Sequence, residues 1–160
     1  MNKAYLLIGG NMGDRKGFLE TARQEIANNC GPLLQQSSLY ETAAWGLQEQ
    51  NAFLNQALCV ETSRAAEGLL QTLLHIETVI GRTRDVKYGP RVIDIDLLFF
   101  NDAVIHLSNL VIPHPQLQNR RFVLVPMDEI APHLVHPIFG KTISQLLAEC
   151  PDTLDVQKIS

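Results

Sequence analysis

The chain has 160 residues, the size of one ordinary domain, and its 46% of apolar residues suffice for a hydrophobic core. A net charge of −4 without a Lys/Arg block argues against nucleic acid as a partner. No segment is long and apolar enough to span a bilayer, and the N-terminus lacks the pattern of a signal peptide. We therefore expect a single domain over residues 1–160 that acts as a cytoplasmic monomer.

Hydrophobic periodicity predicts, in chain order, a strand over 4–8, a helix over 14–29, strands over 35–42 and 53–62, a helix over 65–80, strands over 92–100 and 104–105, a helix within 119–131 and a short helix over 142–149. The core order is β-α-β-β-α-β. This order predicts an α+β, ferredoxin-like fold with a largely antiparallel sheet and helices packed on one face.

Local signals set the boundaries of these elements. Gly9-Gly10-Asn11 predicts a turn that ends the first strand, while Asp14 and Ser63 are placed to cap the two long helices. The loops over 43–52 and 81–91 have no hydrophobic period, so we expect them to flank a site and close over it. The three cysteines are scattered and form no metal-binding pattern, so we expect buried thiols.

The strand over 92–100 carries two aspartates, which strands usually exclude. Asp94 and Asp96 share one face, about 7 Å apart at Cα, with Val92, Leu98 and Phe100. The other face is wholly apolar and is expected to pack in the core. Two neighbouring carboxylates need a cation or a shared proton, and hard oxygen ligands suit Mg²⁺ that is shared with substrate phosphates.

A solvated edge strand is the simpler explanation for an isolated Asp-x-Asp pattern. The preceding loop, however, contains a cluster of basic residues, namely Arg82, Arg84, Lys87 and Arg91. Paired carboxylates beside a basic loop are typical of phosphoryl transfer, in which metals and guanidinium groups hold the phosphates. By contrast, GGNMG at 9–13 lacks the spacing of a phosphate-binding loop and is interpreted as a strand-to-helix turn.

Residues 88–100, YGPRVIDIDLLFF, resemble the signature segment of the 6-hydroxymethyl-7,8-dihydropterin pyrophosphokinase family. AYLLIGGNMGDR, SSLYETAAWGLQEQNAFLNQAL, GRTR, IPHP and NRRFVLVPMDEIAP resemble further segments of that family in the same order. The resemblance implies a ferredoxin-like fold and transfer of pyrophosphate from ATP to the pterin hydroxymethyl group, with release of AMP, in tetrahydrofolate biosynthesis. The implied mechanism is in-line attack of the pterin hydroxyl on the β-phosphorus.

The resemblance also implies the site residues. Asp94 and Asp96 match the ligands of two Mg²⁺ ions, and we add the hypothesis that Asp96 assists with the proton. The matching catalytic and ATP-binding residues are Arg82, Arg91, Glu77, Arg84, His114 and Arg120. The matching pterin-binding residues are Thr42, Phe53, Asn55 and Phe122.

The residue types fit a flat heteroaromatic ring with an amide edge. Phe53 and Phe122 can sandwich the ring, and Asn55 offers both a donor and an acceptor. Core packing remains an alternative for each phenylalanine, and a solvated strand position remains one for Asn55. The rival class is a non-catalytic binding module, because ferredoxin-like sheets also serve as regulatory domains and RNA platforms. Release of AMP from ATP in the presence of pterin separates the two classes.

Overall fold

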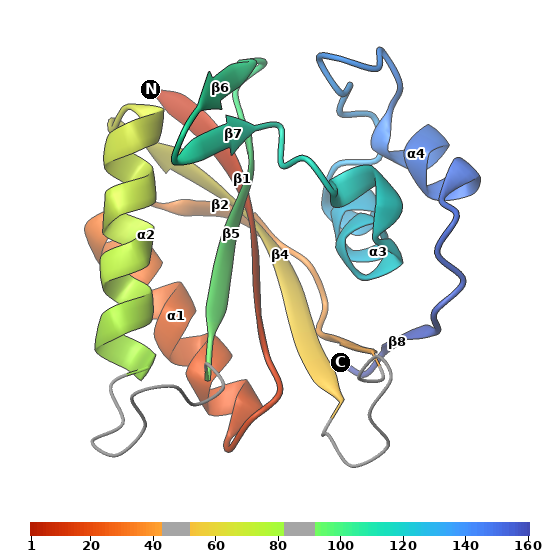
Figure 1. Ribbon diagram of the computed structural model, residues 1–160. Helices are drawn as coiled ribbons and strands as arrows, with labels where there is room; N and C mark the ends of the chain where they lie inside the picture. Colours follow the sequence, from red (N-terminus) through yellow and green to blue (C-terminus); the bar gives the residue numbers. More distant parts are fainter. Residues whose placement is uncertain (43–51, 82–91) are drawn as a thin grey trace.

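The computed structural model describes residues 1–42, 52–81 and 92–160. The predicted loops therefore fall almost wholly outside the described residues. The elements, in order, are β1 (Asn2–Gly10), α1 (Arg15–Asn29), β2 (Leu33–Gln36), β3 (Tyr40–Thr42), β4 (Phe53–Thr62), α2 (Ala66–Gly81), β5 (Asp94–Phe100), β6 (Ile105–Leu107), β7 (Leu110–Ile112), the 3₁₀ turn η1 (Leu117–Asn119), α3 (Arg121–Ile130), α4 (Ile143–Glu149) and β8 (Val156–Lys158) (Figure 1).

The main sheet has the order β5-β1-β4-β3-β8, and β2 also pairs with β4. Each of these pairs is antiparallel. Strand β1 therefore lies between β5 and β4, and β3 pairs with the other edge of β4. This arrangement confirms the predicted ferredoxin-like β-α-β-β-α-β core.

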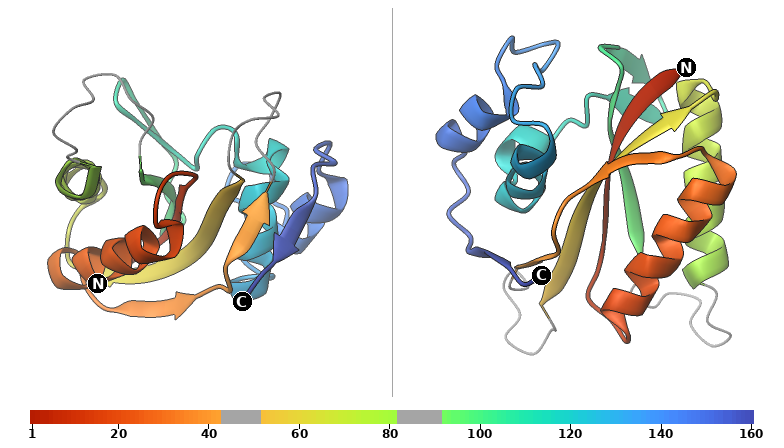
Figure 2. Two further views of the ribbon diagram at one scale, coloured as in Figure 1. Left: turned by 90° about the horizontal axis from the view of Figure 1, so that it is seen from below. Right: turned by 180° about the vertical axis from the view of Figure 1, so that it is seen from behind.

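Helices cover both faces of the sheet. Helices α1 and α2 pack on one face as predicted, but α3 and α4 pack on the other (Figures 1 and 2). The prediction holds for the two core helices, whereas α3 and α4, to which it assigned no face, cover the opposite face. The reason is a second apolar surface on the strands, formed by Tyr5, Leu7, Ala57, Cys59 and Phe99, which must be buried as well.

A β-bulge in β5 changes the predicted distribution of its side chains. The pairing with β1 shifts between Tyr5 and Leu6, so that Leu98 is the extra residue. Ile95 and Leu97 face α1 and α2, but beyond the bulge Phe100 joins them and Phe99 faces α3. The prediction that Phe99 shares a face with Ile95, and Phe100 with the aspartates, is therefore wrong.

The predicted strand over 35–42 consists of two short strands, β2 and β3. Between them Ser37 uses its hydroxyl oxygen, instead of a backbone carbonyl, to accept a hydrogen bond from Ala57 N–H (2.9 Å). The Gln56 side-chain amide donates to the Ser37 carbonyl oxygen (2.6 Å). Because side chains replace ladder bonds here, the strand is interrupted although both halves pair with β4.

Further boundaries differ from those predicted. Gly9 and Gly10 are the last residues of β1 and pair with β4, so the turn begins only at Asn11. Ser63 does not cap α2, because the helix begins at Ala66 and Leu69 N–H donates to the carbonyl oxygen of Ala65.

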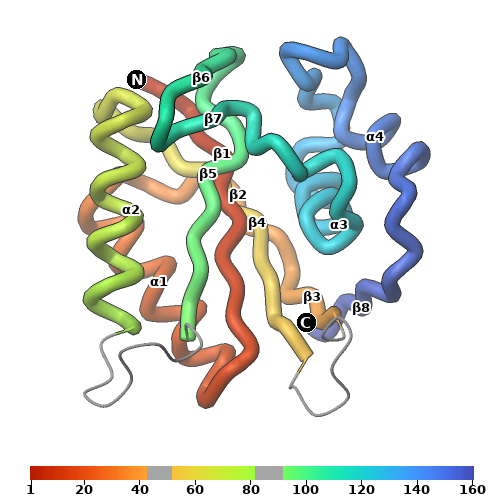
Figure 3. The backbone as a smooth tube through the Cα atoms, in the orientation of Figure 1, coloured from red at the N-terminus to blue at the C-terminus, as the bar shows by residue number. Residues whose placement is uncertain are grey.

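Two strand assignments near the C-terminal half also differ. The segment predicted to return along β5 forms β6, which pairs with β7 in a separate hairpin. Strand β8 was not predicted, because it has only three residues, most of them exposed, and so shows no hydrophobic period. It forms because its backbone pairs with β3 (Figure 3).

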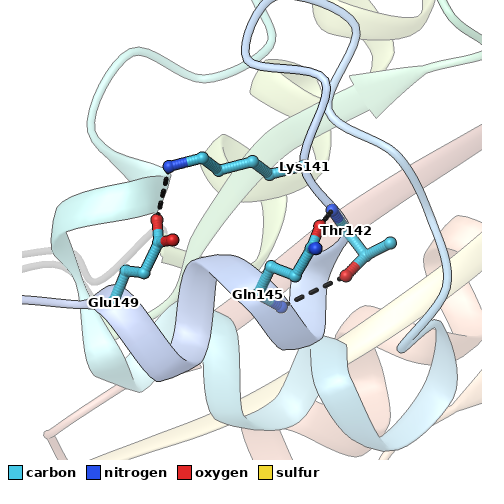
Figure 4. A network of polar contacts seen from close by, with 4 residues as sticks. All are labelled: Lys141, Thr142, Gln145 and Glu149. Atoms are coloured by element: carbon cyan, nitrogen blue, oxygen red, sulfur yellow. Dashed lines mark hydrogen bonds and ion pairs between the residues drawn. The ribbon is translucent and has the colours of Figure 1, made fainter.

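Two helix starts follow local chemistry. Asp14 caps α1 as predicted, accepting a hydrogen bond from Gly17 N–H (3.1 Å). In α4 the Thr142 hydroxyl oxygen accepts from Gln145 N–H, and the Gln145 side chain accepts from Thr142 N–H, a reciprocal capping box (Figure 4). These caps stabilise helix ends whose first N–H groups lack partners within the helix.

Cys30 and Cys59 are buried free thiols as expected, whereas Cys150 is partly exposed. Among residues 1–42, 52–81 and 92–160, no helix combines the length and apolar character needed to cross a membrane.

Candidate active site

A cavity of about 630 Å³ opens on the sheet face that carries α3. Seven of the predicted site residues line it, namely Thr42, Phe53, Asn55, Asp94, Asp96, Arg120 and Phe122. They come from β3, β4, β5 and the start of α3. The fold therefore brings together side chains that are up to 80 residues apart in the sequence.

The two aspartates reach the cavity because β5 is an edge strand of the main sheet. Asp94 pairs with Gly9 and Asp96 with Leu7, and all four residues line the cavity. The intervening Ile95 points to the opposite core, and its N–H donates to a Glu77 carboxylate oxygen (2.7 Å) on α2. This bond satisfies a backbone donor at the sheet edge and holds the strand between the two carboxylates.

Asn55 lies across β1 and β4 from Gly9 and is 5% exposed. A Cβ atom at Gly9 would lie 2.0 Å from Asn55 Oδ1. The Asn55 side chain therefore occupies the space that the missing side chain of Gly9 leaves. Sequence reasoning assigned Gly9 to a turn, although the strand pairing makes it part of the cavity wall.

Thr42 and Phe53 pair across β3 and β4 at the edge of the cavity. Thr42 is 3% exposed, and its hydroxyl has no hydrogen-bond partner among the described residues. A buried hydroxyl without a partner is costly, so this group suits a polar ligand atom.

The start of α3 supplies a cation and an aromatic ring. The Arg120 guanidinium lies 5.9 Å from the centre of the Phe122 ring, within the range of a cation–π contact. Arg121 N–H, in the first turn of the helix, donates to Asp152 Oδ2 (3.0 Å), and Leu154 N–H donates to Asp152 Oδ1 (2.9 Å).

Asp152 thereby holds the segment 151–154 against the start of α3, where it completes the cavity wall. Sequence reasoning missed Asp152, since an aspartate after a helix end carries no signal of a site.

Two predicted residues within the described part of the chain, Glu77 and His114, do not line the cavity. Glu77 binds the backbone of β5, as described above. Burial lowers the pKa of His114, Asp96 acts in the opposite direction, and Arg120 lowers it further, so this imidazole senses charges of the cavity. Arg82, Arg84 and Arg91 lie outside the described residues.

The model of the 7,8-dihydro-6-hydroxymethylpterin-pyrophosphokinase family matches residues 5–132 of the chain. The chain is 42% identical to the 2-amino-4-hydroxy-6-hydroxymethyldihydropteridine pyrophosphokinase of Methylorubrum extorquens, covering 93% of this chain and 94% of that protein. It is 37% identical to the enzyme of the same name from Aquifex aeolicus, covering 93% and 92%.

Solved structures support the fold. The crystal structure of Plasmodium falciparum HPPK-DHPS superimposes with a TM-score of 0.77 at 21% identity, covering 93% of this chain but only 43% of that longer chain. The chain therefore spans less than half of that protein, and the likeness concerns the fold alone. Because the family model and both sequence relatives match most of its length, the chain belongs to the 7,8-dihydro-6-hydroxymethylpterin-pyrophosphokinase family.

Proposed function

We propose that Asp94 and Asp96 hold two Mg²⁺ ions with which this ATP-dependent pterin pyrophosphokinase of folate biosynthesis transfers pyrophosphate from ATP to 6-hydroxymethyl-7,8-dihydropterin. The observation that carries the proposal is the single cavity shared by the two carboxylates, a cationic side chain and a polar aromatic pocket. The reaction follows from the family, and the assignment of residues to steps is our inference.

The pterin occupies the part of the cavity formed by Thr42, Phe53, Asn55 and Phe122, which we call the pterin pocket. The two phenylalanine rings offer stacking surfaces for a flat heterocycle. The hydroxyl of Thr42, which has no partner among the described residues, and the amide of Asn55 offer donors and acceptors for its polar edge. This pairing would remove the cost of leaving the buried hydroxyl unsatisfied.

The two aspartates fit magnesium in the way that nucleotide sites use it. No group of three or more metal-binding side chains occurs in the part of the chain that the structure describes. Mg²⁺ commonly takes only one or two carboxylates and completes its shell with waters and substrate phosphates, so a pair suffices. When bound, the ions neutralise charge on the oxygens of the transferring phosphate chain.

Arginines hold the phosphates. Arg120 lines the cavity, and Arg82, Arg84 and Arg91 are assigned to the same task from the sequence. Glu77 positions β5 through its bond to Ile95 N–H, so that its effect on the nucleotide passes through the strand that carries the aspartates. The carboxylate of Asp96 acts to raise the pKa of His114, against the larger effect of burial.

In the reaction, the pterin hydroxyl oxygen forms a bond to the β-phosphorus while the bond from that phosphorus to the α–β bridging oxygen breaks. AMP leaves with the bridging oxygen, and the hydroxyl proton passes to Asp96 or to solvent. The protein's contribution is to orient the two substrates and to hold their developing charge. Arg82 and Arg91 act on that charge, so their loss is expected to lower kcat more than pterin binding.

The test measures AMP release from ATP, with and without pterin, in Asp94→Asn and Asp96→Asn variants. Each substitution should lower turnover at least about a hundredfold, because metal ions stabilise transition-state charge by several kcal/mol. Asp102→Asn is the matched control, since Asp102 is exposed in the turn after the same strand. Near-normal turnover in either variant at ordinary Mg²⁺ concentration would refute the metal assignment, and pterin binding without AMP release in the unmodified protein would favour a binding module.

Both hydrophobic clusters use residues of β1, β4 and β5, and this supports one domain over residues 1–160. A monomeric state and a cytoplasmic location remain predictions.

A further inference from the structure

A polar cluster joins the end of α3 to the interrupted edge of the sheet. Glu129 Oε2 accepts hydrogen bonds from Ser38 N–H (2.9 Å) and from the Ser38 hydroxyl (3.2 Å), and Oε1 accepts one from the Tyr40 hydroxyl (2.5 Å). We call Ser38, Tyr40 and Glu129 the Glu129 cluster. Glu129 is 91 residues from Ser38 and 89 from Tyr40 in the chain, so the cluster is a tertiary link and no part of a local turn.

The charges of the cluster suit a persistent link. Burial acts to raise the pKa of Glu129, but the hydrogen bonds from Tyr40 and Ser38 outweigh it and lower that pKa below its ordinary value. Burial, together with Glu129, raises the pKa of Tyr40. The carboxylate is therefore ionised and the phenol protonated at neutral pH, which gives charge-assisted hydrogen bonds.

The sheet side of the cluster is fixed without Glu129. Ser37 exchanges bonds with Ala57 of β4, and Gln56 donates to the Ser37 carbonyl oxygen. Gln56 in turn accepts a bond from Arg23 of α1 (2.7 Å). Ser38 and Tyr40 are thus held by the sheet and α1, and Glu129 attaches α3 to this fixed segment.

Each of the two attached elements contributes a side chain to the wall of the pterin pocket. Thr42 lies two residues beyond Tyr40 on β3, so both side chains point to the same face. Phe122 lies in the first turn of α3, at the other end of the helix from Glu129. The helix also packs through apolar side chains, Val123, Leu124 and Met127, but hydrophobic burial is non-directional and allows small shifts.

We propose that Glu129 is a positioning residue that sets the placement of α3 relative to β3, and with it the spacing between Thr42 and Phe122 across the pterin pocket. The inference rests on the proposed function, since it takes the cavity as the pterin site. Glu129 does not line that cavity, so it acts through the elements that it joins.

The experiment compares steady-state kinetics of Glu129→Ala, Glu129→Gln and Tyr40→Phe with the unmodified enzyme. In Glu129→Ala the KM for pterin should rise about tenfold, equivalent to the net loss of roughly one charge-assisted hydrogen bond. The KM for ATP should change little. A loss of folded enzyme alone would lower kcat and leave KM unchanged, so the KM rise separates positioning from mere destabilisation.

Asp128→Asn is the matched control. Asp128 precedes Glu129 on the same helix, but its carboxylate accepts a hydrogen bond from the hydroxyl of Ser144 in α4. Its charge contributes less than that of Glu129 to the raised pKa of Tyr40. Its pterin KM should stay at the unmodified value. Tyr40→Phe removes one hydrogen bond of the cluster and Glu129→Gln removes one acceptor oxygen, so the KM for pterin should rise less in these variants than in Glu129→Ala. Both variants still test the inference if Glu129→Ala does not fold.

An unchanged pterin KM in the variants of the Glu129 cluster, or an equal rise in Asp128→Asn, would overturn the inference. Absence of pterin-dependent AMP release in the unmodified enzyme would instead refute the proposed function, so the two failures are distinguishable.

Discussion

At the scale of single residues, the packing of Gly9 against Asn55 shapes the wall of the cavity that we propose as the pterin pocket. Gly9→Ala would place a methyl group 2.0 Å from Asn55 Oδ1 and must displace that buried amide. We expect the KM for pterin to rise roughly tenfold or more, because the polar edge of the pterin would lose the hydrogen bonds that the Asn55 amide offers. The KM for ATP should change much less.

Gly68→Ala is the control for this prediction. No atom lies within 4 Å of a Cβ at Gly68, which is in α2. Replacing a helical glycine by alanine should stabilise the protein by up to about 1 kcal/mol without affecting kinetics. Steady-state kinetics of both variants test the prediction. An unchanged KM for pterin in Gly9→Ala would refute the assignment of Asn55 as a pterin-binding residue.

At the scale of elements, the segment between α3 and α4 depends on the neutral form of His136. This imidazole is 2% exposed, and its Nδ1 accepts hydrogen bonds from Ile138 N–H and Phe139 N–H (both 3.2 Å). Its ring stacks on Phe139 and meets the edge of Phe99 from β5. Protonation of Nδ1 would remove the acceptor and break both bonds.

Burial lowers the pKa of His136 below its ordinary value, so the unfolded chain binds the proton more readily than the folded one. The free energy of unfolding should therefore fall as the pH decreases below about 6.5, by at most about 1.4 kcal/mol per pH unit for this group. Denaturant titrations between pH 7.5 and pH 5 measure how the free energy of unfolding changes with pH. This slope should be smaller in His136→Asn, because asparagine does not titrate.

His133→Asn, at an exposed position of the same segment, is the control substitution. His114 contributes in the same direction as His136, because burial lowers its pKa also, so a residual slope is expected in His136→Asn. Equal slopes in His136→Asn and the unmodified protein would contradict the role given to His136.

At the scale of the whole molecule, ligand binding should couple to stability through the aspartate pair. Mg²⁺ with a non-hydrolysable ATP analogue binds the folded chain, and at a hundredfold excess over its Kd it should add about 2.7 kcal/mol to the free energy of unfolding. This corresponds to a rise in Tm of roughly 5–10 °C for a protein of this size.

Thermal unfolding followed by circular dichroism measures the rise. Asp94→Asn and Asp96→Asn should lose most of it, while Asp102→Asn should retain it. Without ligand, either site variant should be as stable as the unmodified protein or slightly more so, since one repelling charge is gone. A full rise in Tm in both site variants would show that the nucleotide binds without these carboxylates.

Much of this protein is determined by local sequence. The long helices and the strands β1, β4 and β5 follow from hydrophobic periodicity, and the α1 cap follows from one aspartate. The order of these elements predicts the ferredoxin-like core. The paired aspartates predict a site at this strand, because two carboxylates on one strand face need a cation or a shared proton, and both line the cavity.

Tertiary structure alone decided the features that depend on distant partners. The bulge at Leu98 arises from pairing with β1, and the gap between β2 and β3 arises because Ser37 and Gln56 replace backbone bonds. Gly9 and Asp152 enter the cavity, and Glu129 reaches Tyr40, only after segments far apart in the chain have packed. Local periodicity encodes which face of an element is apolar, but it does not encode which neighbouring element its polar groups will contact. The hydrogen bonds between elements form only after the fold has brought those elements together.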